Sequence, residues 1–440
     1  MARLLFIVLI PVLFLPGLAQ PLLPVIEGLE EISHEGRVLS EIRLEGNRRT
    51  RDLAILRELY LQPGLAFDIR LLQRDLRFLD SIGLFESVSA QVREEEDRLI
   101  LTLLVRERGL SSMRQLYPNL DFDSRMRPRL SLIYRHRNLR GLREDLTLMK
   151  SQGWEEGMYL KLNRPWLGVQ PLEHTFLYSH RDLDAEDRDE FRESWGSFSL
   201  WIPLDRSRPL DRRFLIQLLL GERYQEEGED SWEESLNAAS VGFSVDLRER
   251  MIRPDRGVSF LCVFSRFSPL IGSSHDLKKL ILKGARYRRL PGGSVLAMKA
   301  ELGLQSGDLY HRGSWGLGGI DAVRGWAQGE WSGWDAGAGG EPQGRNRFLA
   351  RLEIRRDLFP RSCFQIWRVG KVLIEAESLL FVDAGVLWNR GMPWDTQSAS
   401  ATFSPGIGLR LFSPFGDVLR LEAGLNPEGG VRLHLGTRLP

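Results

Sequence analysis

The most distinctive group of residues lies in a glycine-rich stretch of 41 residues, 306–346, which also holds four tryptophans. In its middle stand Val323, Arg324, Gly325 and Trp326. A guanidinium in a low-dielectric surrounding needs a carboxylate or an aromatic ring as its partner, and arginine can bind a carboxylate through two parallel hydrogen bonds. The chemistry that these residues support is structural, because such an arginine would pin a long loop in place. On its own, however, the stretch favours an ordinary glycine turn with a solvated arginine.

No part of the sequence has the residue spacing of a catalytic or metal site. The motifs GxSxG and HExxH, a Walker loop and paired metal ligands are all absent. The seven histidines are scattered along the chain. We therefore expect no enzyme, no cofactor and no metal. A hydrolase with catalytic residues at the rim of a barrel is the alternative from another class.

Charge and cysteine content narrow the class of protein further. The net charge is +1, without a basic stripe or tail, which argues against a nucleic-acid partner. Cys262 and Cys363 stand alone without a CxxC motif. A disulfide between them stays open, although both lie in strand-like segments that favour packed thiols.

The N-terminus predicts a secretory signal peptide over residues 1–19. Arg3 precedes a 15-residue apolar run, and small residues, Gly17 and Ala19, stand at positions −3 and −1 of the expected cleavage site. An uncleaved anchor is the alternative, but two prolines interrupt the run and it is short for a span. Residues 20–37 are rich in Pro, Gly and Glu and predict a linker. No later apolar stretch approaches about 18 residues, which excludes a helical membrane protein.

Residues 38–107 predict a small α+β domain with the element order β-α-α-β-β. A strand over 38–44 alternates apolar and polar residues and ends at a Gly-Asn turn. Two segments with helical spacing follow, and Thr50 and Asp68 are their candidate N-caps. Two further alternating strands, separated by an acidic turn, close the domain within 88–105.

Residues 108–440 predict an all-β, antiparallel transmembrane barrel of 16 strands. Helical periodicity disappears here, and segments of 9–11 residues alternate polar and apolar side chains, the length that a tilted strand needs to cross a bilayer. Tight turns alternate with longer polar connections such as 181–193 and 222–235, which we expect to face outward. Tryptophans near the strand ends, Trp166 and Trp195 among them, predict aromatic girdles. The expected strands lie near 110–117, 129–137, 143–151, 157–164, 172–180, 194–202, 213–222, 238–249, 257–266, 277–288, 295–305, 347–356, 375–385, 404–412, 418–425 and 430–438.

Both parts resemble the BamA/TamA superfamily of outer-membrane proteins. Within 38–107, the string IRLEGNRRT…LYLQPGLAFDIRLLQRDLRFLDSIGLFESVSAQV is similar to a POTRA domain. The sequence VRG followed by Trp326 resembles the lumen-loop motif of the barrel, and FVDAGVLW, 381–388, resembles the strand motif FxDxGxxW. The stretches SPGIGLR and SPFG, within 404–416, resemble the hairpin before the last two strands. The resemblance covers essentially the whole mature chain, in the correct order.

This resemblance implies a role for the glycine-rich loop. In the family, the face that carries Phe381, Asp383 and Gly385 looks into the barrel lumen. We therefore hypothesise that Arg324 pairs with Asp383, that Phe381 stacks nearby, and that these contacts pin the folded-in loop. The chain departs from the family in its last residue, Pro440, where an aromatic residue is usual, and in having one POTRA-like unit where the central insertase has several. We therefore do not expect this protein to be the main insertase for barrel proteins in its cell.

The expected location is the outer membrane of a Gram-negative-type bacterium, with the POTRA-like domain in the periplasm. The edge of its sheet would accept a strand from an unfolded or partner polypeptide; alternatively, the domain merely braces or plugs the barrel. The resemblance implies outer-membrane protein assembly or polypeptide translocation. A two-partner-type secretion transporter and a surface antigen or adhesin are the alternatives. The expected partners are outer-membrane lipid, polypeptides and accessory proteins; the sequence leaves open the client and whether the barrel seam opens.

Overall fold

The computed structural model describes residues 34–109, 113–122, 128–153, 155–168, 170–184, 190–205, 211–227, 230–249, 253–309, 314–326, 344–366, 370–391, 399–412 and 418–437. The expected signal peptide, 1–19, and most of the expected linker lie outside these residues and stay predictions. Across the described part of the chain, no helix has both the length and the apolar character to span a membrane.

The N-terminal part is a small domain of one sheet and two helices. Its elements are β1 (Leu39–Glu45), α2 (Asp52–Leu56), α3 (Ile69–Ser81), β2 (Phe85–Glu95) and β3 (Arg98–Glu107), and the sheet order is β1-β3-β2. Strand β1 runs parallel to β3, and β2 runs antiparallel to it. Leucines and phenylalanines from both helices and all three strands form one buried core. The predicted order β-α-α-β-β is confirmed.

The two predicted helix caps have different outcomes. Asp68 caps α3, because its carboxylate accepts hydrogen bonds from the backbone N–H groups of Arg70 and Leu71. The prediction for Thr50 is wrong: the residue after it is the N-cap of α2, and no side chain bonds there. The Thr50 hydroxyl instead accepts a hydrogen bond of 2.9 Å from Nδ2 of Asn138 in the barrel. A distant partner therefore takes the hydroxyl that the local sequence assigned to the helix.

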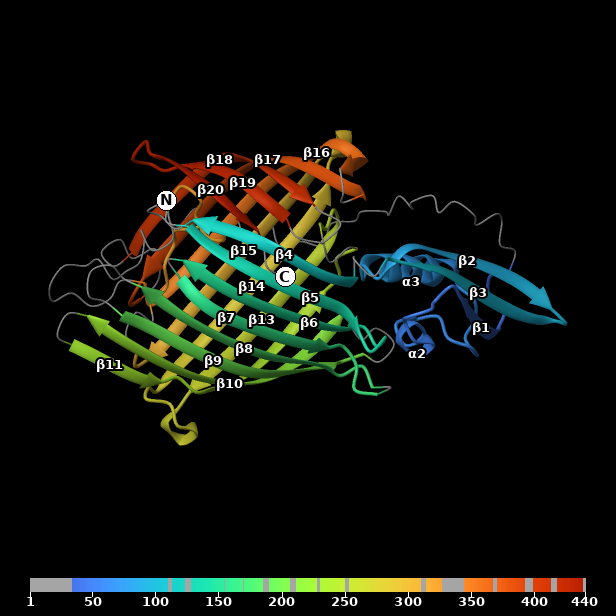
Figure 1. Cartoon of the computed structure of the whole chain (residues 1–440), viewed down its shortest axis with the longest axis horizontal. Helices are drawn as coiled ribbons and strands as arrows, with labels where there is room; N and C mark the ends of the chain where they lie inside the picture. Colours follow the sequence, from blue (N-terminus) through green and yellow to red (C-terminus); the bar gives the residue numbers. More distant parts are fainter. Residues whose placement is uncertain are drawn as a thin grey trace.

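The remainder of the chain is a closed antiparallel barrel (Figure 1). Strands β11 and β12 both pair with β10 and together occupy one position, so that the closed sheet has the predicted 16 positions. The strands are β4 (Arg114–Phe122), β5 (Pro128–Leu139), β6 (Glu144–Gly153), β7 (Glu155–Arg164), β8 (Glu173–Asp184), β9 (Glu190–Pro203), β10 (Arg212–Glu227), β11 (Asp230–Ser235), β12 (Ala238–Asp246), β13 (Gly257–Phe267), β14 (Leu277–Arg289), β15 (Val295–Gly307), β16 (Asn346–Ile366), β17 (Gly370–Trp388), β18 (Ala399–Phe412), β19 (Val418–Leu425) and β20 (Val431–Thr437). Short 3-10 helices, η1 (Pro269–Ile271) and η2 (Pro291–Gly293), lie in two of the connections.

Two expectations about the strands are corrected. The first strand lies at Arg114–Phe122 rather than near 110–117. The segments 181–193 and 222–235 are not simply polar loops. Strand β8 continues to Asp184 and pairs with β9 from Glu190, and β10 continues to Glu227 and pairs with β11. The ends of these strands are rich in charged residues, and their composition therefore resembles that of a loop.

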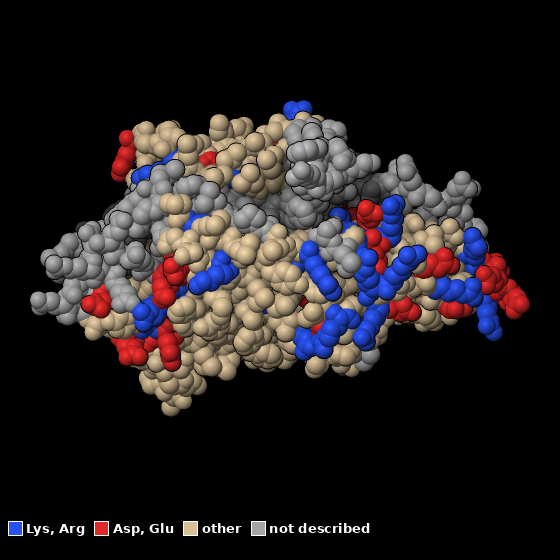
Figure 2. Space-filling view, viewed as in Figure 1, with Lys and Arg blue, Asp and Glu red and all other residues tan. Residues whose placement is uncertain are grey.

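The barrel has an apolar outer face and a polar inner face. Side chains on the outer face are exposed and apolar, for example Leu218, Leu380 and Ile407. Figure 2 shows that charged residues gather over the small domain and the two ends of the barrel, while the middle of the barrel is largely uncharged on this side. This is the distribution expected of a barrel in a bilayer.

The small domain packs against the turns at one end of the barrel (Figure 1). The buried carboxylate of Glu58 lies 2.6 Å from Nη1 of Arg143 and accepts a hydrogen bond of 2.6 Å from Nε1 of Trp166. On the neighbouring helix, Nη2 of Arg74 donates to Asp211 at 2.6 Å. Trp166 therefore contributes to this interface rather than to an aromatic girdle. These polar contacts hold the domain in one orientation at this end of the barrel.

Candidate functional site

The side chain of Arg324 lies at the centre of a fully buried group of charges. Its Nε and Nη2 donate to the two carboxylate oxygens of Asp383, each at 2.6 Å. Its Nη1 donates to Glu353 at 3.1 Å and to Glu422 at 3.0 Å. The guanidinium carbon lies 3.5 Å from the centroid of the Phe381 ring. The structure thus brings together the residues that we hypothesised to pair, and adds two carboxylates.

The backbone of Arg324 is held as closely as its side chain. Nε2 of His434, on the last strand, donates to the Arg324 carbonyl oxygen at 2.7 Å. A Cβ atom on Gly424 would lie 2.5 Å from that oxygen, so only glycine permits this approach. A Cβ on Gly325 would lie 2.7 Å from Oγ of Ser404, so this position also requires glycine. The loop therefore rests directly on the backbone of the barrel wall.

The other motif residues extend this contact. Val323 is fully buried. Nε1 of Trp326 donates to Oγ1 of Thr402 at 2.9 Å. A Cβ on Gly385 would lie 2.4 Å from Leu317, so this glycine makes room for the loop. Each of these motif residues therefore has a packing role in seating the loop on the wall.

The four-residue segment 323–326 contacts five consecutive strands. This follows from the register of the sheet, which places residues from distant parts of the sequence side by side on the lumen face. The contacts are with Glu353 of β16, Asp383 of β17, Thr402 of β18, Glu422 of β19 and His434 of β20.

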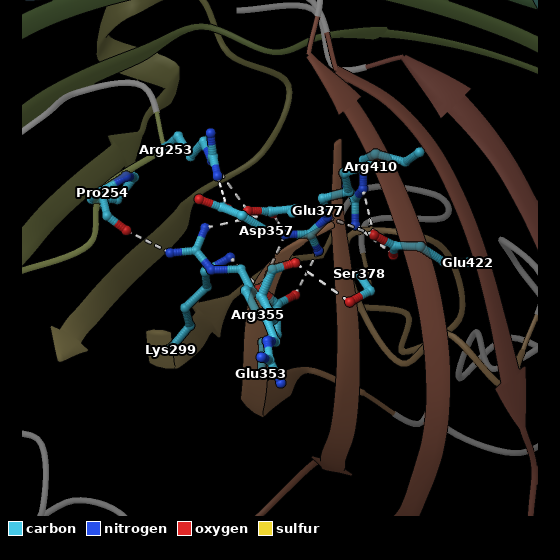
Figure 3. A network of polar contacts seen from close by, with 12 residues as sticks. Arg253, Pro254, Lys299, Glu353, Arg355, Asp357, Glu377, Ser378, Arg410 and Glu422 are labelled. Atoms are coloured by element: carbon cyan, nitrogen blue, oxygen red, sulfur yellow. Dashed lines mark hydrogen bonds and ion pairs between the residues drawn. The ribbon is translucent and has the colours of Figure 1, made fainter. Parts of the chain in front are cut away.

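A wider charge network links Glu353 and Glu422 of this site to Arg253 (Figure 3). Arg410 joins two carboxylates of the site, with Nη2 donating to Glu353 at 2.7 Å and Nε donating to Glu422 at 2.8 Å. It also lies 3.6 Å from Glu377, which accepts from Nε of Arg253 in the connection between β12 and β13 at 3.4 Å. Further members are Lys299, Asp321, Arg355, Asp357 and Arg420.

Each buried carboxylate of this network has basic partners. Asp383 contacts Arg324, and both Glu353 and Glu422 contact Arg324 and Arg410. Glu377 lies near Arg355 and Arg410. Removing one member of a buried ion pair leaves an uncompensated charge and costs about 3–5 kcal/mol. Such a network can hold a loop in one position, and it offers no nucleophile paired with a base.

Sequence reasoning missed the carboxylates of Glu353 and Glu422 and the imidazole of His434 as site residues. A signal was available, since Arg351, Glu353 and Arg355 alternate on one face, and the polar residues around Glu422 do the same. That signal identifies the lumen face but not the pairing. Cys262 is a free thiol, and the side chain of Cys363 lies outside the described part.

Two protein-family models match the chain. The model described as "Omp85 superfamily domain" matches residues 156–427, and the POTRA model described as "Surface antigen variable number repeat" matches residues 38–108. No curated protein matches the chain in sequence.

Solved structures share the fold at low sequence identity. BamA from Haemophilus ducreyi lacking POTRA domains 1–3 is 17% identical with a TM-score of 0.54, and the match covers 91% of this chain and 83% of that one. CdiB from Escherichia coli is 15% identical with a TM-score of 0.60, covering 92% and 75%. CdiB from Acinetobacter baumannii is 13% identical with a TM-score of 0.59, covering 91% and 73%. The chain therefore belongs to the Omp85 superfamily, as an outer-membrane β-barrel protein with a periplasmic POTRA domain.

Proposed function

We propose that this protein assembles or translocates polypeptides at the outer membrane, without catalytic groups or a cofactor. The POTRA domain receives a client or partner chain in the periplasm. The barrel then passes that chain into or across the membrane while the loop pinned by Arg324 keeps its wall in a working arrangement.

The observation that carries this proposal is the contact of segment 323–326 with five consecutive strands, β16 to β20. A pore that only conducts solutes has no need for a loop that fastens its C-terminal strands together. A protein whose wall must rearrange for a client does need such a fastening, because packed elements switch between discrete arrangements.

The POTRA sheet supplies a second line of support. Its order β1-β3-β2 leaves β1 and β2 with one edge each that pairs with no other strand of the sheet. On β1 this edge begins after Leu39, whose backbone bonds to Gly64 and Leu65. An unpaired edge can bind an extended segment of another chain through main-chain hydrogen bonds, largely independently of its sequence. This suits a domain that must accept unfolded clients.

The first test replaces the central guanidinium. Purified protein in liposomes should accelerate the folding of a urea-denatured barrel protein, measured by the change in its electrophoretic mobility. Arg324→Ala leaves three buried carboxylates without their shared cation, so we expect at least a tenfold loss of this activity. Arg192→Ala, which breaks an exposed ion pair with Asp182 in the barrel, is the control and should keep full activity. Full activity of Arg324→Ala in the liposomes would refute the proposed role of the loop pinned by Arg324.

Secretion of one dedicated polypeptide is the second candidate. A cysteine scan of β4 against β20, in a Cys262→Ser, Cys363→Ser background, would give pairs that close the seam covalently. If clients enter the bilayer between these strands, closure should abolish insertion. If the chain secretes a polypeptide through its lumen, closure should leave export intact.

A further inference from the structure

The barrel closes between two short strands, β20 and β4. Strand β20 has 7 residues and β4 has 9, whereas β16 and β17 have 21 and 19. Strand β4 also contains Pro118, which has no backbone N–H to donate to a neighbouring strand. In the described part of the chain the two closing strands are therefore short, and contacts from the lumen can add to those that keep β20 in place.

One side chain of β20 reaches the pinned loop. His434 pairs in the sheet with Glu422, a member of the charge network, and so points into the lumen. Its neighbours Leu433 and Leu435 are exposed on the outer face. From this position, Nε2 of His434 donates to the Arg324 carbonyl oxygen at 2.7 Å.

We propose that His434 is a positioning residue that holds the closing strand β20 against the lumen loop. The ion pairs of the Arg324 side chain hold the loop on β16, β17 and β19, and the hydrogen bond to the Arg324 carbonyl holds β20 against the loop. The ion pairs of Arg324 therefore also determine how firmly the last strand stays in the barrel. The consequence for a client rests on the proposed function, because a strand released from the loop would open a pairing edge.

The hydrogen bond from His434 and the ion pairs of the loop use different atoms of Arg324, its carbonyl oxygen and its guanidinium. Mutation can therefore remove one without the other. Replacing the Arg324 side chain removes its ion pairs but keeps its carbonyl oxygen. Replacing His434 removes the donor to that oxygen and leaves all the ion pairs of Arg324 in place. Each substitution therefore removes one link of the chain of contacts from β17 to β20.

The experiment is amide hydrogen exchange of the full-length protein in detergent micelles, followed for peptides from β20, β4 and loop residues 314–326. For His434→Ala we expect exchange in β20 and β4 to rise by about fivefold to tenfold, the effect of losing one hydrogen bond, while the loop stays protected. Arg324→Ala should raise exchange in the loop and in β20 together. In the Arg324→Ala background, His434→Ala should add little, because the loop no longer anchors the strand.

Two further variants complete the test. His434→Gln keeps an N–H donor of similar reach and should restore protection of β20, which separates the hydrogen bond from the packing of the ring. His174→Ala removes a barrel histidine whose Nδ1 contacts a carbonyl two residues away, and should leave β20 unchanged. Unchanged exchange in β20 for His434→Ala, or an equal rise in every strand, overturns the proposal. Because exchange is measured without a client, failure of the proposed function would not affect this result.

Discussion

At the scale of single residues, the site depends on close approach as much as on charge. The Arg324 carbonyl lies against Gly424 of β19, where a Cβ atom would stand only 2.5 Å away. The guanidinium on the same residue has partners on three strands. The absence of one methyl group therefore sets the position from which the arginine reaches its carboxylates.

This close approach leads to a prediction for Gly424→Ala. The added methyl should push the loop off β19 and weaken its attachment by about 1–3 kcal/mol, the usual cost of overpacking. Limited proteolysis or hydrogen exchange of residues 314–326 would measure this effect. Gly284→Ala in β14 is the matched control, because a Cβ there meets no atom within 4 Å. Equal protection of the loop in both variants would contradict the prediction.

At the scale of elements, helix α3 is tied to the segment after α2 by a buried carboxylate. Asp75 is 1% exposed, and its two oxygens accept the backbone N–H groups of Tyr60 and Leu61 at 3.0–3.1 Å. Burial raises the pKa of Asp75 from 3.8 to about 6, against the lowering effect of these hydrogen bonds. The carboxyl is therefore neutral in the folded domain at a pH where it would ionise in the unfolded chain.

The sign of the resulting pH dependence follows directly. Below pH 3.8 the group is protonated in both states, and its contribution to stability is lost as the pH rises through about 6. We therefore expect helix α3 to exchange its amide hydrogens roughly tenfold faster at pH 7 than at pH 5, after correction for intrinsic rates. Asp75→Asn should abolish this difference. A pH dependence that survives in Asp75→Asn would assign it to another group.

At the scale of the whole molecule, the POTRA domain is fastened to the barrel rather than tethered by a flexible linker. Glu58 on the domain meets Arg143 and Trp166 on two barrel turns, and Arg74 meets Asp211 on another. The carboxylates of Glu58 and Asp211 are buried, and breaking an ion pair of a buried carboxylate is more costly than breaking a surface ion pair. The domain should therefore sample only a narrow range of orientations relative to the barrel in solution.

The test of this arrangement is Glu58→Ala. Removing the carboxylate leaves Arg143 and Trp166 without their shared acceptor, so the domain should sample a wider range of orientations. With one spin label on the domain and one on the barrel, double electron–electron resonance would show this as a broadened distance distribution. Glu86→Ala, which removes only an exposed pair with Arg106, should keep the distribution narrow. A narrow distribution in both variants would mean that apolar packing alone fixes the domain.

The sequence by itself determined most of the architecture. Period-two alternation predicted strands that coincide with most of the 16 barrel positions, and helical spacing with the Asp68 cap predicted α3. These features are local, since the side-chain period of a strand and the cap of a helix depend on neighbours within a few residues. Strand ends were less predictable, because β10 and β11 pair through mostly polar residues that resemble a loop in composition.

The tertiary structure alone decided which residues meet at the site. The sequence motifs indicated Arg324 and Asp383, but Glu353, Glu422 and His434 lie 29, 98 and 110 residues from Arg324 along the chain. Only the register and closure of the barrel bring such residues together, because a shift of one residue in any strand would turn its charged side chains toward lipid. In the same way, the hydroxyl of Thr50, which the local sequence assigns to a helix cap, takes its partner from the barrel.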